Sequence, residues 1–167
     1  MGYTVRQART RDVPGIRSLI DQNVASGRLL GKPTVNLYED IQEFCVAERD
    51  ADGSVAGCGA LHVMWEDLAE IRTVAVDAGA RGYGIGHRIV ETLLDRGRQL
   101  GVARVFVLTF AVPFFASHGF TEISGTPVAP EVYAELLRSY DEGVAEFLEL
   151  DRVKPNTLGN TRMLLRL

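Results

Sequence analysis

Hydrophobic residues recur at helical spacing in two segments of the chain. The first segment begins after Asp12, which can cap a helix that has Pro14 in its first turn. Its apolar positions are Val13, Ile16, Leu19, Ile20 and Val24. The second segment covers residues 87–100 and is followed by Gly101, a residue that commonly ends helices. Its apolar positions are Ile89, Val90, Leu93, Leu94 and Leu100. Both patterns predict amphipathic helices that bury one face.

Alternating or continuous apolar stretches predict strands between these helices. The predicted strands cover residues 3–8, 44–48, 54–63, 70–77, 104–109, 120–123 and 161–167. The sequence Asp-Ala-Asp-Gly at 50–53 predicts a hairpin turn. The alternation within 70–77 slips near Thr73 and Val74, which predicts a β-bulge there.

Shorter helices are predicted over 35–44, 113–118 and 130–140, whereas residues 141–159 give no clear pattern. One strand, loop, helix and strand follow one another in the middle of the chain, which favours a crossover connection. A chain of 167 residues is long enough for one hydrophobic core. The pattern therefore predicts a single α+β domain, a three-layer α/β arrangement, over residues 1–167.

Composition narrows the class of protein. The net charge of −4 and the lack of a basic cluster argue against nucleic acid as the main partner. Apolar runs fall far short of the roughly 18 residues that a membrane span needs, and the N-terminus has no apolar stretch typical of a signal peptide. Cys45 and Cys58 match no metal or redox motif, so we expect two buried thiols in a reducing compartment. These features predict a cytoplasmic protein without a membrane partner.

The most informative motif is Arg-Gly-Tyr-Gly-Ile-Gly at residues 81–86, between a predicted strand and a predicted helix. Glycines allow successive backbone amides to point into one concavity, and the following helix adds the positive end of its dipole. Together these features favour binding of a diphosphate, with Arg81 as an additional charged contact. The dinucleotide fingerprint fails because its third glycine position is His87 or Ile89, and the Walker motif lacks its Lys. The remaining alternative is that this glycine-rich segment only connects the strand to the helix and binds no ligand.

The spacing Arg-x-x-Gly-x-Gly after a strand resembles the acyl-CoA-binding motif of the GNAT N-acetyltransferase family. The segment Phe-Phe-Ala-Ser-His-Gly-Phe at 114–120 resembles a second motif of that family, at the family's usual distance from the first. The resemblance covers most of the chain up to about Phe120. It implies a splayed mixed central sheet, acetyl-CoA as co-substrate and no metal.

A finer resemblance connects residues 27–32, 69–72 and 106–109 with the acetyltransferase domain of N-acetylglutamate synthases. It implies transfer of acetyl to the α-amino group of L-glutamate or L-glutamine, the first step of arginine biosynthesis. The chain departs from that group's pattern after Gly125. Homodimers are common among proteins of this fold, so a homodimer is an expectation by analogy.

Transfer from a thioester to an amine needs a donor for the developing oxyanion and a base for the amine. A backbone amide freed by the predicted bulge near Val74 can be the donor, and the resemblance implies that the backbone of Val74 to Val76 also pairs with the pantetheine arm. We take Glu70 as the base, acting directly or through water, with His62 as its rival. Phe115 replaces the Tyr that serves many relatives as an acid, so Ser117, Thr109 or water are the remaining candidates for that step. The residues expected to bind the cofactor are Val74, Ala75, Val76, Arg81, Gly82, Tyr83, Gly84, Ile85, Gly86, Thr109 and Phe115.

A glutamate acceptor carries two carboxylates and therefore requires cations at separate points. The candidates are Arg28, Lys32, Arg72 and Arg162, each of which can also be an ordinary surface charge. Two alternatives stay open. One is a GNAT enzyme for another amine, such as a polyamine, a drug or a protein N-terminus. The other is a module that senses acyl-CoA without turnover.

Overall fold

The computed structural model describes residues 2–25, 32–150, 153 and 159–167. Seven strands form one mixed sheet with the hydrogen-bonded order β1-β2-β3-β4-β5-β7-β6. Residue contacts divide the chain into two compact units. Unit 1 comprises residues 1–62 and 71–100, and unit 2 comprises residues 63–70 and 101–167. Strands β3 and β4 therefore contribute residues to both units, and each unit is described separately below.

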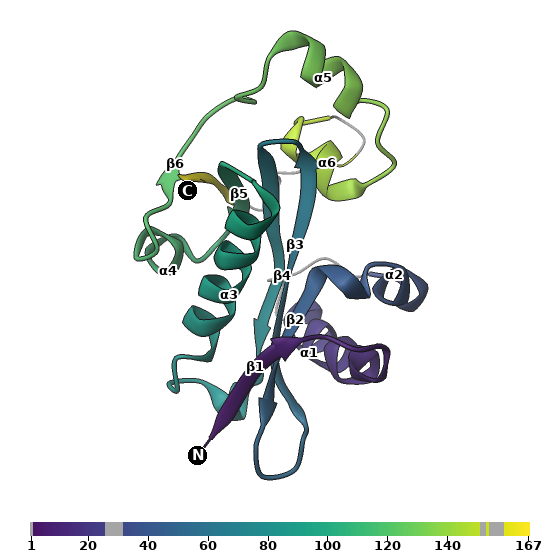
Figure 1. The fold of residues 1–167 in the computed structure, drawn as a ribbon, viewed down its shortest axis with the longest axis vertical. Coiled ribbons are helices and arrows are strands. Elements are labelled where there is room, and N and C mark those ends of the chain that lie inside the picture. The colour runs from purple at the N-terminus through teal and green to yellow at the C-terminus, as the bar shows by residue number, and fades with distance from the viewer. Residues whose placement is uncertain (1, 26–31, 151–152, 154–158) are drawn as a thin grey trace. The chain divides into compact units, whose positions relative to one another are not determined.

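Unit 1 contains the α-helices α1, α2 and α3 and the strands that they cover (Figure 1). Its elements are β1 (Tyr3–Gln7), η1 (Thr10–Asp12), α1 (Val13–Ala25), α2 (Thr34–Glu39), η2 (Ile41–Glu43), β2 (Phe44–Arg49), most of β3 (Val55–Trp65), the second part of β4 (Leu68–Val76), η3 (Ala78–Ala80) and α3 (Ile85–Leu100). Strand β2 is antiparallel to both β1 and β3, and the Gly53 amide closes the predicted hairpin turn on the Arg49 carbonyl. Helices α1 and α2 lie on one face of these strands and α3 on the other (Figure 1).

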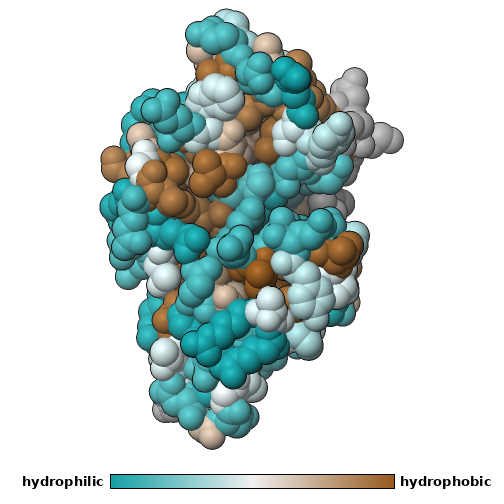
Figure 2. Space-filling view, turned by 45° about the vertical axis from the view of Figure 1, so that its right-hand side comes forward, coloured by the Kyte–Doolittle hydropathy of each residue, from teal (hydrophilic) through white to brown (hydrophobic). Residues whose placement is uncertain are grey.

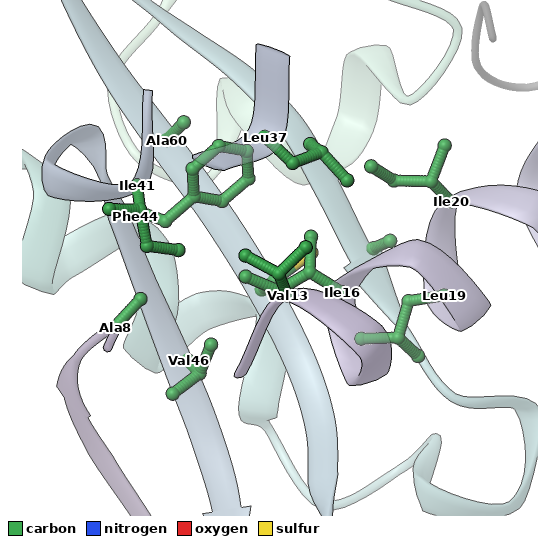
Figure 3. Close-up of a cluster of buried hydrophobic side chains, with 12 residues drawn as sticks. Ala8, Val13, Ile16, Leu19, Ile20, Leu37, Ile41, Phe44, Val46 and Ala60 are labelled. Carbon is green, nitrogen blue, oxygen red and sulfur yellow. The ribbon is translucent and has the colours of Figure 1, made fainter. Parts of the chain in front are cut away.

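Small residues alternate along β3 and set how closely helices approach each face. Cys58 and Ala60 face the side of α1, where a buried cluster joins residues of α1, α2, η2 and the sheet (Figure 3). On the other face, Gly57 and Gly59 lie directly under α3. A Cβ atom at Gly59 would lie 2.7 Å from the Cγ2 atom of Ile89. The lack of side chains at these two positions therefore allows α3 to approach the sheet closely.

Unit 2 contains the remaining elements: the ends of β3 and β4 that meet at residues 63–70, β5 (Arg104–Thr109), α4 (Val112–Ala116), β6 (Thr121–Glu122), α5 (Pro130–Leu136), α6 (Glu142–Phe147) and β7 (Thr161–Arg166). Strand β5 pairs in parallel with β4 from Leu68 to Glu70, and it pairs antiparallel with β7. Phe106 and Phe147 meet edge to face, with ring centres 5.0 Å apart, in the core of this unit. The predicted crossover from β4 through α3 to β5 is therefore present.

The structure differs from the local predictions at three places. The segment predicted as one helix over 35–44 is the short helix α2 followed by η2 and the start of β2. Helix α6 lies within residues 141–159, where no element was predicted. Asp12 does not cap α1 through its side chain in the way expected. Instead its carboxylate accepts hydrogen bonds from the Arg9 amide and the Arg6 guanidinium.

Figure 2 shows one face of the molecule, on which hydrophilic residues predominate and hydrophobic residues gather in separate patches. No helix among the described residues is long and apolar enough to cross a membrane. Cys45 and Cys58 are both buried and free, as the sequence predicts.

Candidate functional site

The glycine-rich segment connects η3 to the start of α3 in unit 1. Gly82 and Gly84 adopt φ angles of +86° and +74°, in the left-handed region that side chains disfavour. No atom lies within 4 Å of a Cβ atom built at either position. These glycines are therefore required by the backbone conformation rather than by crowding, and the space beside the loop is open to a ligand.

The amides at the start of α3 have the arrangement of an anion site. Those of Gly84, Ile85 and Gly86 donate no hydrogen bond among those found within the described residues. They lie at the first turn of a helix of 16 residues, where the partial positive charge of the helix dipole is concentrated. A diphosphate fits this donor set, because each amide can donate to a phosphate oxygen.

Side chains beside the loop differ in their exposure. Ile85 is buried in the core, whereas Arg81 is exposed and its guanidinium can reach a ligand. Tyr83 is 52% exposed, and its ring packs against that of Tyr3 with centres 5.6 Å apart. Hence Tyr83 has a protein partner, in addition to the cofactor contact that the sequence predicts.

Asp77 anchors the loop from the end of β4. Its carboxylate accepts hydrogen bonds from the Arg49 guanidinium at 2.9 Å and the Gly79 amide at 3.2 Å. Its own amide donates to the Ala56 carbonyl at 2.8 Å. The sequence analysis missed Asp77 as a functional residue. An Asp directly after a strand and two residues before a Gly is a signal that could have identified this turn.

Strand β4 carries the predicted bulge position. Thr73 adopts a φ angle of +59°, which is rare for a β-branched residue within a strand. The irregularity lies where the sequence alternation slips. Beyond it Ala75 is buried, and Val74 and Val76 are partly exposed. Arg72, the residue before Thr73, is also partly exposed.

Glu70 belongs to the part of β4 that lies in unit 2. We expected a carboxylate at the start of the strand, but β4 begins two residues earlier and Glu70 is only 4% exposed. It pairs with Phe106 in the parallel ladder to β5. Glu70 is therefore a buried carboxylate within β4 rather than an exposed one at the start of the strand.

His62, the rival base, has an acidic partner in unit 1. Its Nδ1 atom lies 2.9 Å and 3.0 Å from the two carboxylate oxygens of Glu43. The ring is therefore held in one orientation by a contact between β3 and η2, an arrangement that the sequence could not reveal because 19 residues separate the two.

The predicted cofactor residues of unit 2 are part of its packing. The Thr109 hydroxyl accepts a hydrogen bond from the Ala111 amide at 2.8 Å. Phe115 is 4% exposed and meets Phe114 and Phe120 edge to face. Thr109 therefore caps the turn after β5, and Phe115 anchors α4 to the rest of unit 2.

Arg162 of β7 binds backbone carbonyls within unit 2. Its terminal nitrogens donate to the carbonyls of Gly125, Glu146 and Phe147 at 2.9, 3.1 and 2.7 Å. Burial lowers the pKa of this guanidinium, against the opposing effects of Glu149 and Glu70. Arg162 thus holds the C-terminal end of α6 in place. The predicted contact with substrate would need the N–H groups of Arg162 that do not bind these carbonyls.

Of the predicted acceptor-binding residues Arg28 and Lys32, only Lys32 lies within the described residues. Lys32 lies with its Nζ atom 3.7 Å from an Asp40 carboxylate oxygen and 6.0 Å from the centre of the Phe44 ring. Its main-chain carbonyl accepts a hydrogen bond from Arg17. Arg28 lies outside the described residues. Among the described residues, no group of three His, Cys, Asp or Glu side chains is arranged to hold a metal ion.

Comparison with known proteins places these features in a family. Residues 19–121 match the model of the acetyltransferase (GNAT) family. A relative from Mycobacterium tuberculosis, named amino-acid acetyltransferase, is 63% identical over 96% of this chain and 92% of its own length. Another amino-acid acetyltransferase, from Neisseria meningitidis, is 36% identical over 72% of this chain but only 28% of its own length.

Solved structures agree with the sequence comparison. A Mycobacterium tuberculosis protein crystallised in complex with CoA and NLQ has a TM-score of 0.94 and 62% identity, and the match covers 98% of this chain and 99% of the other. The N-acetylglutamate synthase of Neisseria gonorrhoeae, complexed with coenzyme A and N-acetyl-glutamate, has a TM-score of 0.78 and 27% identity. That match covers all of this chain and 35% of the synthase. The chain therefore belongs to the acetyltransferase (GNAT) family, which confirms the predicted fold, the enzyme class of acyltransferase and the use of acetyl-CoA as acetyl donor.

Proposed function

We propose that this enzyme transfers an acetyl group from acetyl-CoA to the α-amino group of a free amino acid, L-glutamate or L-glutamine. The observation that carries the proposal is the 63% identity with an amino-acid acetyltransferase over nearly the full length of both chains. Under this proposal the protein acts in the first step of arginine biosynthesis. We further propose that it works in the cytoplasm, in keeping with its two buried free thiols, and that it forms a homodimer, by analogy with its fold.

The loop before α3 has the properties needed to hold the diphosphate of the donor. The amides of Gly82 to Gly86 would donate to phosphate oxygens, and Arg81 would add a charged hydrogen bond. Tyr83 and Ile85 would contact the cofactor at the same loop. Val74, Ala75 and Val76 would pair through their backbone with the pantetheine arm, like an added strand. Thr109 and Phe115 are proposed as further contacts with the cofactor.

The donor supplies the acetyl group as a thioester, and two groups of β4 would act on the reaction. Glu70 would take a proton from the acceptor ammonium, so that the neutral amine can attack. The Val74 amide would donate a hydrogen bond to the carbonyl oxygen as negative charge develops there. Burial of Glu70 excludes water from the carboxylate and suits this role. We keep His62, oriented by Glu43, as the alternative base.

Acceptor binding is proposed for the basic residues identified from the sequence. Lys32 and Arg72 are partly exposed and would each pair with one carboxylate. Arg28 and the remaining N–H groups of Arg162 complete the proposed set.

The test is release of free thiol from acetyl-CoA in the presence of each of the 20 amino acids, a polyamine and a peptide with a free N-terminus. We expect turnover with glutamate or glutamine. Glu70→Gln should lower kcat by about 100-fold, the usual contribution of a general base, whereas the exposed Glu122→Gln should leave it unchanged. Turnover with the polyamine or peptide alone would disprove the amino-acid acceptor. Tight CoA binding without any transfer would indicate a sensing module instead.

A further inference from the structure

The side chain of Cys58 contacts the backbone next to Val74. The Cys58 Sγ atom lies 3.4 Å from the Thr73 carbonyl oxygen, at hydrogen-bonding distance for sulfur. Cys58, Thr73 and Val74 belong to unit 1, and Cys58 is completely buried. The thiol of β3 therefore contacts the peptide group that joins Thr73 to Val74 in β4.

Thr73 needs such support because its backbone is strained. A φ angle of +59° costs free energy for any residue with a Cβ atom and is rarer still for a β-branched one. Strained conformations of this kind persist only where their surroundings hold them, and they are frequent at active sites. The hydrogen bond from the thiol to the Thr73 carbonyl is a contact that can hold it.

The thiol is in the right protonation state for this contact. Burial, with a smaller contribution from Cys45, raises the pKa of Cys58 to about 12 against the opposing effect of the nearby Ala75 backbone. Cys58 is therefore an uncharged S–H group at neutral pH, able to donate to the Thr73 carbonyl. Its raised pKa also makes it unreactive as a nucleophile.

The side chain of Val74 lies on the opposite face of the sheet. Its Cγ2 atom is 3.4 Å from a Cβ atom built at Gly59, on the side of α3. Cys58 lies in the buried cluster on the side of α1. The contact of the thiol with the Thr73 carbonyl therefore acts on the peptide group that carries the Val74 amide.

We propose that Cys58 is a positioning residue, which holds Thr73 in its left-handed conformation and so fixes the direction of the Val74 amide. The inference depends on the proposed role of that amide as the donor to the developing oxyanion. Cys58 would thereby contribute to catalysis without acting as an acid, a base or a nucleophile. Cys58 acts through Val74 and touches no substrate.

Cys45 supplies a matched control. It is 3% exposed, lies on the neighbouring strand β2, and burial likewise raises its pKa to about 12. In β2 it pairs with Gly59, one position away from Cys58. Cys45→Ala therefore removes an equally buried thiol without removing a hydrogen bond to Thr73.

The experiment compares Cys58→Ala, Cys58→Ser and Cys45→Ala in steady-state kinetics and in CoA binding by calorimetry. We expect Cys58→Ala to lower kcat about 10-fold, less than the full loss of an oxyanion donor, with a Kd for CoA within about twofold of the wild type because the diphosphate is held elsewhere. Cys58→Ser should recover most of kcat, since a hydroxyl both donates and accepts. Cys45→Ala should match the wild type in kcat. Equal kcat in the two alanine variants, or an effect confined to the melting temperature, would overturn the proposal.

NMR of the Thr73 carbonyl carbon tests the same contact without any substrate. Its chemical shift should change in Cys58→Ala and keep the wild-type value in Cys45→Ala, because only the first variant removes the hydrogen bond to that carbonyl. An unchanged Thr73 carbonyl shift in Cys58→Ala would contradict the inference. Failure of the wild type to acetylate any amino acid would count against the proposed function alone, because the NMR measurement still decides whether Cys58 holds Thr73.

Discussion

The Arg49 guanidinium donates a hydrogen bond to the Asp77 carboxylate across 2.9 Å and thereby connects the end of β2 with the residue that precedes η3, the short helix before the glycine-rich loop. Both side chains are about three-quarters buried. Asp77 uses the same carboxylate oxygen to accept from the Gly79 amide. The backbone that leads into the loop is thus held by contacts within unit 1, and such preorganisation would reduce the entropic cost of the proposed CoA binding.

Removal of this anchor should weaken binding of CoA. In Asp77→Ala the hydrogen bonds from Arg49 and Gly79 are lost, so we expect the Kd for CoA to rise roughly 3- to 10-fold, an effect of about 1 kcal/mol. Calorimetry measures the affinity. Asp52→Ala is the control, because Asp52 accepts hydrogen bonds from Ser54 in the hairpin turn. Equal affinity in the two variants would show that the anchor does not organise the loop.

A side chain at Gly84 should obstruct the diphosphate. Gly84 and Gly101 flank the two ends of α3, have positive φ angles and leave open space for a Cβ atom. Gly84→Ala and Gly101→Ala should therefore each lower the free energy of unfolding by about 1 kcal/mol through backbone strain. Only Gly84→Ala should also weaken CoA binding, by at least about 10-fold, because its methyl group enters the proposed anion site. Similar CoA affinity in both variants would mean that the diphosphate does not bind at Gly84.

Contact between β3 and α3 should be sensitive to one added methyl group. The Cβ atom of Gly59→Ala would lie 2.7 Å from Ile89 and 3.1 Å from Leu93, so we expect a loss of about 1–3 kcal/mol in the free energy of unfolding, measured with urea. Ile89→Ala creates the space that the methyl group needs. The double variant should therefore be more stable than the sum of the single effects predicts, by about 1 kcal/mol. Strict additivity would contradict the proposed steric contact.

The interaction between Asp12 and Arg6 should make stability depend on acidic pH. Burial by itself would raise the pKa of Asp12, but hydrogen bonds from the Arg6 guanidinium and the Arg9 amide lower it below its ordinary value of 3.8. A carboxylate with a depressed pKa stabilises the fold above the pKa of the unfolded state, and this contribution disappears as the pH falls through the folded-state pKa.

Asp12→Asn should therefore cost about 2 kcal/mol in the free energy of unfolding at pH 7, the range for a hydrogen bond to a charged partner. The difference from the wild type should shrink as the pH falls below about 4. Urea unfolding at several pH values measures it. A difference that stays constant down to pH 2 would indicate that the charge of Asp12 contributes nothing.

The sequence by itself determined the elements whose pattern is strong. The amphipathic repeat of residues 87–100 predicted α3 with an error of two residues at its start, and Gly101 ended it as expected. The glycines at 82 and 84 predicted a tight loop because few other residues adopt positive φ angles. These features depend on local periodicity and backbone sterics, which neighbouring residues are sufficient to specify.

Tertiary structure decided the contacts between residues distant in sequence. The burial of Glu70, the Glu43 partner of His62 and the carbonyls bound by Arg162 all depend on strand register and helix packing, which no single segment encodes. The contact of Cys58 with Thr73 joins two strands and supports a conformation that β-branched residues disfavour. Local sequence thus specified where the glycine-rich loop forms, whereas packing across the sheet set which side chains hold the surrounding backbone in place.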